Sequence, residues 1–119
     1  VISQYVNTLS VRSSMTQDNI KGESAIFFCT WTADDTENPD ELIVSLSGQD
    51  YLIKCGISHF PYNCTAKNNY ELSNSARGLV SMSINGLSCS NQGKYFCSIL
   101  EHSDELKQEK SASFLNFTK

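Results

Sequence analysis

The sequence contains no run of about 18 or more apolar residues, so no segment is expected to cross a membrane as a helix. Its 9 basic residues are scattered along a chain with a net charge of −4. The basic stripe that non-specific nucleic-acid binding needs is therefore missing. The chain also begins without the basic start and apolar middle of a signal peptide. We interpret residues 1–119 as one domain, a mature piece of a longer protein.

Patterns for catalysis and metal binding are missing too. There is no C-x-x-C pair, and neither His59 nor His102 lies at zinc-finger spacing. No nucleophile elbow, Gly-rich phosphate loop or His-x-x-x-His spacing occurs. The acidic stretch 33–41 lacks the spacing of a calcium motif and is interpreted as a solvated loop. We expect no enzymatic activity, no metal, no cofactor and no small-molecule substrate.

Cysteine, in contrast, is frequent for a chain of this length: Cys29, Cys55, Cys64, Cys89 and Cys97. Two glycosylation sequons accompany the cysteines, one at Asn63 and one at Asn116. Together they favour an oxidising, extracellular compartment. The odd number of cysteines leaves one thiol without a partner in the chain.

Apolar residues recur with a period of two, and no long helical periodicity is present. Alternating runs separated by turn residues predict short strands at 23–31, 40–46, 50–57, 78–87, 93–100 and 111–117. Strands at this spacing are typical of an all-β sandwich. The polar tract 100–112 lies between two predicted strands, so we predict a hairpin loop there and no helix.

The stretch "LSCSNQGKYFC" (87–97) resembles the signature before the second cysteine of immunoglobulin-superfamily domains, with Leu87, Gly93, Tyr95 and Cys97 in the matching positions. The stretch 45–54 is similar to the turn between strands C and C′ of variable-type domains, and 79–87 is similar to their E strand. The resemblance implies an immunoglobulin-like V-type β-sandwich: two antiparallel sheets in a Greek key, joined by a Cys29–Cys97 disulfide.

The chain departs from the family pattern at the tryptophan of strand C. That position falls at Leu42, and no tryptophan is near it. Trp31 has the same strand parity as Cys29, so we predict that it points inward and fills the vacated volume. The alternative is a half-exposed Trp31 at the start of the B–C loop.

Two further departures concern polar features of the family. Variable domains pair an arginine on strand D with an aspartate on the E–F turn, but these positions fall near Tyr70 and at Asn91. Both charges are absent together, which avoids one unpaired buried charge. The last strand, 111–119, lacks the Phe-Gly-x-Gly bulge of rearranged antigen receptors. A germline-encoded surface or secreted domain is therefore expected.

The remaining cysteines suggest a second, local bridge. Cys55 and Cys64 flank a short predicted hairpin that contains Pro61, so we expect them to form a disulfide. Cys89 would lie in the E–F turn, where two interpretations are open. It is either a buried free thiol, or it bridges a neighbouring domain or a second chain.

The outward face of the G-F-C-C′ sheet is the predicted binding site. Alternation along 93–100 directs one set of side chains inward with Cys97 and the other set outward. The outward set and its neighbours on adjacent strands form a patch of four apolar side chains: Ile43, Phe96, Leu100 and Phe114. Such a patch indicates a protein partner, unless the F–G hairpin or another domain covers it. The resemblance points to the same face.

Charges of both signs in 101–112 are predicted to rim this patch, among them Glu101, Asp104 and Lys107. Such a mixture suits contact between two identical copies across a two-fold axis, although a solvated hairpin tip is the alternative. We therefore expect an extracellular protein-binding domain of a cell-surface receptor. Its role would be cell–cell recognition, adhesion or immune recognition, with a protein ligand or a second copy as partner. A secreted or viral immune-modulating protein and a structural spacer domain are the alternatives.

Overall fold

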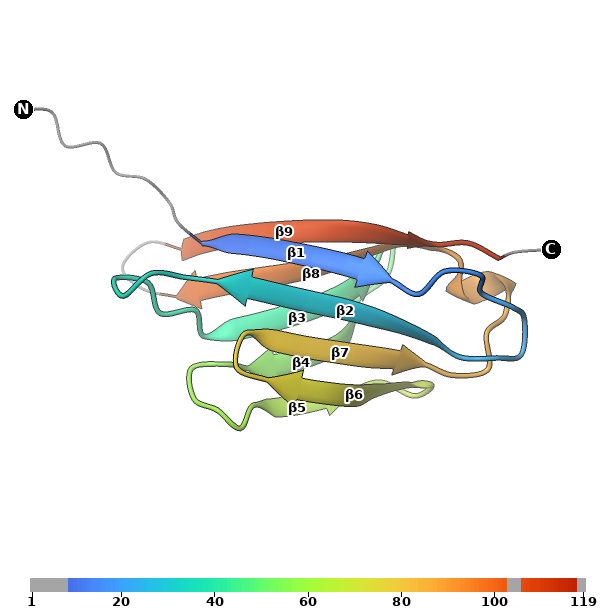
Figure 1. Ribbon diagram of the computed structural model, residues 1–119, viewed down its shortest axis with the longest axis horizontal. Coiled ribbons are helices and arrows are strands. Elements are labelled where there is room, and N and C mark those ends of the chain that lie inside the picture. Colours follow the sequence, from blue (N-terminus) through green and yellow to red (C-terminus); the bar gives the residue numbers. More distant parts are fainter. Residues whose placement is uncertain (1–8, 103–105, 118–119) are drawn as a thin grey trace, which may run out of the picture.

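Two antiparallel β-sheets packed face to face form the protein in a computed structural model that describes residues 9–102 and 106–117 (Figure 1). Within these residues there are nine strands and one 3-10 turn, η1 (Cys89–Asn91). The strands are β1 (Ser10–Met15), β2 (Ala25–Thr32), β3 (Glu41–Leu46), β4 (Tyr51–Gly56), β5 (Asn63–Ala66), β6 (Tyr70–Ala76), β7 (Leu79–Ile84), β8 (Gly93–His102) and β9 (Leu106–Leu115). In the described part of the chain no helix is long and apolar enough to span a membrane.

The two sheets have the strand orders β1-β2-β7-β6 and β5-β4-β3-β8-β9. Every pair of neighbouring strands is antiparallel. Four strands in one sheet and five in the other is the arrangement of variable-type sandwiches, in which two extra strands extend the G-F-C sheet. The predicted fold class, a sandwich of two antiparallel sheets with an inter-sheet disulfide, is confirmed.

The core lies between the sheets because alternate residues of each strand point inward. Tyr95, Cys97 and Ile99 of β8 have no exposed surface. Beside them in the same sheet, Leu42 and Val44 of β3 are also buried. The opposite sheet contributes Ala25, Phe27 and Cys29 of β2 together with Val80, Met82 and Ile84 of β7. Strands β2, β3 and β8 in particular have one buried face and one outward face that is less buried.

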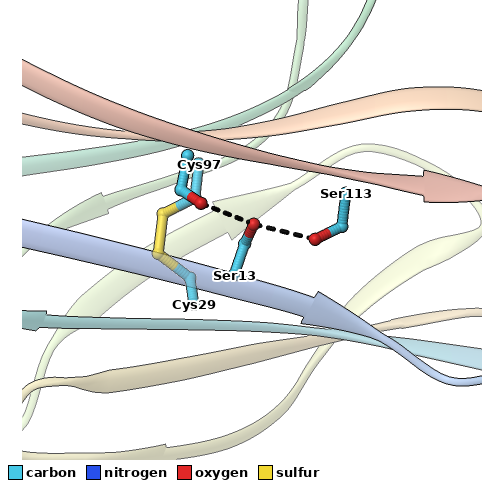
Figure 2. The surroundings of a disulfide bond; sticks show 5 residues. Ser13, Cys29, Cys97 and Ser113 are labelled. Carbon is cyan, nitrogen blue, oxygen red and sulfur yellow. Dashed lines mark hydrogen bonds between the residues drawn. A yellow bond between two sulfur atoms is a disulfide. The ribbon is translucent and has the colours of Figure 1, made fainter.

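The disulfide between Cys29 of β2 and Cys97 of β8 joins the sheets at the centre of this core. A short polar seam lies beside it (Figure 2). Ser13 of β1 hydrogen-bonds through its hydroxyl to the hydroxyls of Ser111 and Ser113 on β9, at 2.8 and 2.9 Å. These bonds connect the edge strand of one sheet to the edge strand of the other, so the sandwich is closed along this side.

A tyrosine corner fixes the turn before β8. The buried Tyr95 hydroxyl donates a 2.6 Å hydrogen bond to the carbonyl oxygen of Asn91, the contact that the sequence signature implies. The Asn91 side chain accepts from the backbone N–H of Ser88 at 2.8 Å and donates to the Tyr70 hydroxyl at 3.4 Å. Tyr70 and Asn91, the positions where variable-type domains have an arginine–aspartate ion pair, are thus joined by a neutral hydrogen bond.

The prediction for the tract 100–112 was wrong in its extent. β8 continues to His102 and β9 begins at Leu106, and the two strands pair over ten positions. Only 103–105 separates them, so a long hairpin with a short connection replaces the predicted loop. Ladder hydrogen bonds along β8 outweigh the low β-propensity of the lysine- and glutamate-rich segment.

Trp31 was expected either to fill the core or to lie half-exposed at the start of the loop after its strand, and its observed position is intermediate. It lies at the end of β2, is partly buried, and packs against the edge of the core. Its ring lies 5.7 Å from the ring of Tyr62, centroid to centroid. Leu42, at the position where the family has its tryptophan, is fully buried and pairs with Cys55 of β4. Trp31 therefore fills volume at one end of the sandwich and not beside the central disulfide.

Gly93 explains why the signature needs glycine at the start of β8. Its φ of +141° is unfavourable for residues with a side chain, and an added Cβ would lie 3.1 Å from a methyl carbon of Leu46. We predict that Gly93→Ala lowers the free energy of unfolding by about 1–3 kcal/mol in denaturant titrations. The control is Gly56→Ala, since Gly56 of β4 lacks a positive φ and an added Cβ meets nothing closer than 4.0 Å. Equal losses for the two variants would contradict this explanation.

Candidate protein-binding face

The outward side of the five-stranded sheet consists of side chains aligned in rows across the strands, because residues directly opposite each other project to the same side. One row joins Tyr51 of β4, Ser45 of β3, Phe96 of β8 and Ala112 of β9. The next contains Thr65, Lys54, Ile43, Ser98 and Lys110, from β5 across to β9. A third pairs Lys94 with Phe114. The four predicted apolar residues do project to one side, but lysines lie among them.

The lysine ammonium groups lie over the aromatic rings of this face. Lys94 and Lys110 place their nitrogens 5.2 and 5.1 Å from the centre of the Phe96 ring, and Lys94 lies 5.8 Å from the Phe114 ring. Lys54 and Lys67 approach the Tyr51 ring to 4.6 and 4.7 Å. These are cation–π distances. We call these seven residues the aromatic–lysine face: Tyr51, Lys54, Lys67, Lys94, Phe96, Lys110 and Phe114.

Exposure differs among the predicted patch residues. Phe114 is 59% exposed, whereas Ile43, Phe96 and Leu100 are half-buried. The four lysines of the face are exposed. Their alkyl chains cross the sheet surface while their charged ends remain in solvent, as long basic side chains commonly do. The face is therefore mixed in character, with accessible aromatic surface and positive charge.

Two of the charged residues predicted to rim the patch need correction. Glu101 lies inside β8 and is 7% exposed. Its carboxylate accepts a 3.0 Å hydrogen bond from the backbone N–H of Asn38 and lies 4.0 Å from the Lys107 ammonium. Glu101 thus contacts both Lys107 and the segment before β3, so this carboxylate is not available to a partner. Asp104 lies outside the described residues.

A histidine and two carboxylates lie at the end of the five-stranded sheet where β8 ends and β3 begins. His102 Nδ1 lies 2.7 Å from Oδ1 of Asp40, and its backbone N–H donates to Oδ2 of the same residue. Nε2 lies 3.8 Å from Oε1 of Glu41. The hydrogen bond to Asp40 raises the pKa of His102, with Coulombic contributions from Asp40 and Glu41. Burial works to raise the pKa of Asp40, but the contacts with His102 outweigh it and lower that pKa.

Aromatic residues also gather where the loops after β2 and β4 meet. Phe60 and Tyr62 pack edge to face at 5.0 Å, and Arg77 lies 5.4 Å from the Phe60 ring centre. The Tyr62 hydroxyl accepts a 2.9 Å hydrogen bond from the Gly78 N–H, which joins this loop to the other sheet. A neighbouring cavity of about 450 Å³ is lined by Trp31 of β2 and by residues of both loops, Pro39 and Ile57 among them. These contacts make the loop end a packed structural cluster.

The described cysteines form two disulfides. Cys55 and Cys64 face each other on β4 and β5 and are bonded, as expected from their spacing. Pro61 lies in the connection between these strands. Cys89 is a free thiol in η1, and it is exposed, so the buried alternative for this residue was wrong. No group of three or more potential metal-ligating side chains occurs among the described residues.

Both predicted glycosylation sites are accessible. Asn63 begins the edge strand β5, and Asn116 follows β9. Both asparagines are exposed. Asn116 lies two residues beyond Phe114, so a glycan there would border the aromatic–lysine face.

The sequence prediction missed the lysines and Tyr51 as members of this face. Alternation on β8 places Lys94 on the same side as Phe96, and that signal was available from the sequence. Lys54 and Lys110 join the face through strand pairing, and a bulge between Val44 and Ser45 sets Tyr51 opposite Ser45. Lys67 follows β5, and its backbone N–H bonds to the Leu52 carbonyl. Sequence alternation alone does not reveal such contacts.

Comparison of the sequence with models of known protein families found no match, and a search of curated protein sequences also found none. Inferences about function therefore rest on the fold and on the side chains described above.

The contact between His102 and Asp40 predicts a measurable titration. Because its pKa is raised, His102 keeps its proton to a higher pH than an isolated histidine does. The ion pair with Asp40 forms on the acid side of that pKa and is lost as the pH rises through it. We expect Asp40→Asn to lower the pKa of His102 in an NMR titration. An unchanged value would show that Asp40 is not the cause.

Proposed function

We propose that this chain is a variable-type domain of the immunoglobulin superfamily and that it binds another protein through the aromatic–lysine face. It would serve as the extracellular recognition domain of a cell-surface receptor, in cell–cell recognition, adhesion or immune recognition. The observation that carries the proposal is Phe114, a large apolar side chain that is 59% exposed beside further aromatics on an ordered sheet.

The family assignment is supported by features that depend on one another. The strand order, the Cys29–Cys97 bridge, and the hydrogen bond from Tyr95 to the Asn91 carbonyl occur together in the arrangement expected for variable-type domains. The Asn91–Tyr70 contact joins the positions where those domains have an ion pair. Two disulfides support an oxidising compartment.

The choice of face is supported by the contrast with the other sheet. The five-stranded sheet presents three aromatic rings on its outward rows, and aromatic residues are enriched in protein interfaces. On the outward rows of the four-stranded sheet the apolar residues are Ile26, Phe28 and Leu79, which are half-buried. The exposed Leu72 of β6 pairs with the core residue Met82 and is flanked along the chain by polar residues. A secreted immune-modulating protein would use the same face, whereas a structural spacer domain would not need it.

Binding of fluorescent tetramers of the glycosylated domain to a panel of cells tests this proposal. Phe114→Ser removes exposed aromatic surface, so we expect at least a tenfold loss of binding with an unchanged unfolding midpoint. The matched control is Leu72→Ser, which removes an exposed apolar side chain from the other sheet and should leave binding intact. Equal effects of the two variants, or no binding to any cell, would count against the proposed face.

Passage through the secretory pathway gives a separate prediction. Expressed with a signal peptide in eukaryotic cells, the domain should carry glycans at Asn63 and Asn116, because both asparagines are exposed within sequons. Asn63→Gln and Asn116→Gln should each reduce the intact mass by one glycan. The mass after enzymatic deglycosylation is the reference. A wild-type mass equal to that of the unmodified chain would contradict this expectation.

A further inference from the structure

We infer that the partner of the aromatic–lysine face is an acidic protein surface, and not a second copy of this chain. The inference rests on the proposed function and specifies the chemistry of its ligand. It starts from the distribution of charge. The whole chain has 9 basic and 13 acidic residues, yet four of the basic residues gather on this face.

The rows that make up the face contain no acidic side chain. Every residue from Tyr51 across to Ala112, from Thr65 across to Lys110, and in the Lys94–Phe114 pair is basic, apolar or hydroxylic. Asp50, in the turn before β4, and Glu109 of β9 adjoin face residues along the chain but lie outside these rows. Glu109 pairs with Ile99 and so projects to the other side of the sheet. In the next row on this side, Glu41 pairs with Leu100, and its carboxylate lies 3.8 Å from His102, which also contacts Asp40. None of these three rows therefore contains an acidic residue that could neutralise the lysines.

The geometry of the lysines indicates that their charges are held in place for a partner. Lys94 and Lys110 lie on the same ring, that of Phe96, and Lys54 and Lys67 lie on that of Tyr51. An aromatic face that orients an ammonium group reduces the conformational freedom it would lose on binding. Each ammonium still has donors directed toward solvent, where a carboxylate can accept hydrogen bonds.

A second copy does not suit this face. In a two-fold symmetric contact the same patch meets itself, so the rows bearing the lysines would approach the same rows of the other copy. Four ammonium groups from each copy would then lie close together without carboxylates between them, which is unfavourable. Of the mixed charges expected to favour self-association, Glu101 is buried and lies against Lys107, so this carboxylate does not compensate for the lysines.

A protein is favoured over a sulfated glycan because the face also presents apolar surface. Phe114 is more than half exposed, and Ile43, Phe96 and Leu100 are partly so. A polysulfated chain would contact the lysines and leave this apolar area in water. An acidic protein surface with apolar side chains at its centre would cover both, as protein interfaces with apolar cores and polar rims do.

The test is charge reversal in the same tetramer assay. We expect Lys94→Glu combined with Lys110→Glu to reduce cell binding at least tenfold, and wild-type binding to weaken as NaCl is raised. The matched control is Arg12→Glu combined with Lys21→Glu, which makes the same change in net charge at exposed positions away from the face and should bind like wild type. Circular dichroism checks that both double variants are folded.

Each result distinguishes this inference from the proposed function. If Phe114→Ser abolishes binding but the lysine reversal does not, the face is correct and the acidic partner is wrong. If neither variant affects binding, the proposed function fails as well. Binding that survives trypsin treatment of the cells but is lost after heparin-lyase treatment would overturn the protein partner in favour of a sulfated glycan. Reversible dimerisation of the wild-type domain in sedimentation equilibrium, abolished by the lysine reversal, would identify a second copy instead.

Discussion

The alternation of side chains along β8 is the constraint on which both the core and the candidate binding face depend. Tyr95, Cys97 and Ile99 are fully buried, and Cys97 is bonded to Cys29 in the opposite sheet. Since neighbouring residues of a strand project to opposite sides, Phe96 must then point outward. A slip of one residue would exchange the two sets and would place the charged Lys94 in the core. The disulfide and the tyrosine corner thus hold the register that keeps the aromatic–lysine face on the outside.

Features that depend on neighbours along the chain could be predicted from the sequence. Strands β2, β3, β4, β7 and β8, both disulfides and the outward direction of Phe96 and Phe114 follow from alternation, spacing and the signature before Cys97. The edge strands β1, β5 and β6 lack that alternation and were not predicted. Features that depend on contacts between distant segments could not. Glu101 reads as an exposed loop residue until the backbone of Asn38, 63 residues away, is placed beside it. The tract that becomes β9 reads as a loop because its composition is polar, and only pairing with β8 makes it a strand.

Each departure from the variable-type pattern that the sequence resembles has its own physical compensation. A buried ion pair stabilises a fold only when its hydrogen bonds repay the desolvation of two charges, and removing one partner alone is costly. Here the Asn91 side chain bonds the neutral Tyr70 hydroxyl, so no charge is left unpaired at that position. The missing strand-C tryptophan is compensated differently. Leu42 is packed without exposure beside Cys55, and Trp31 and Tyr62 cover the end of the core.

The chain has a net charge of −4, yet one of its faces carries four lysines. This uneven distribution of charge affects the orientation in which a partner would approach. At physiological ionic strength charges separated by more than about 8 Å in solvent are largely screened, so a docking partner responds to the face and not to the whole chain. The excess of acids elsewhere makes the surface of the domain electrostatically asymmetric. An acidic partner would be attracted from one side and repelled from the others, which favours encounters in the productive orientation. Two copies of the domain would gain nothing from this asymmetry if their lysine faces had to meet. An arrangement that weakens self-pairing while orienting an unlike partner accords with the proposed recognition of a different protein.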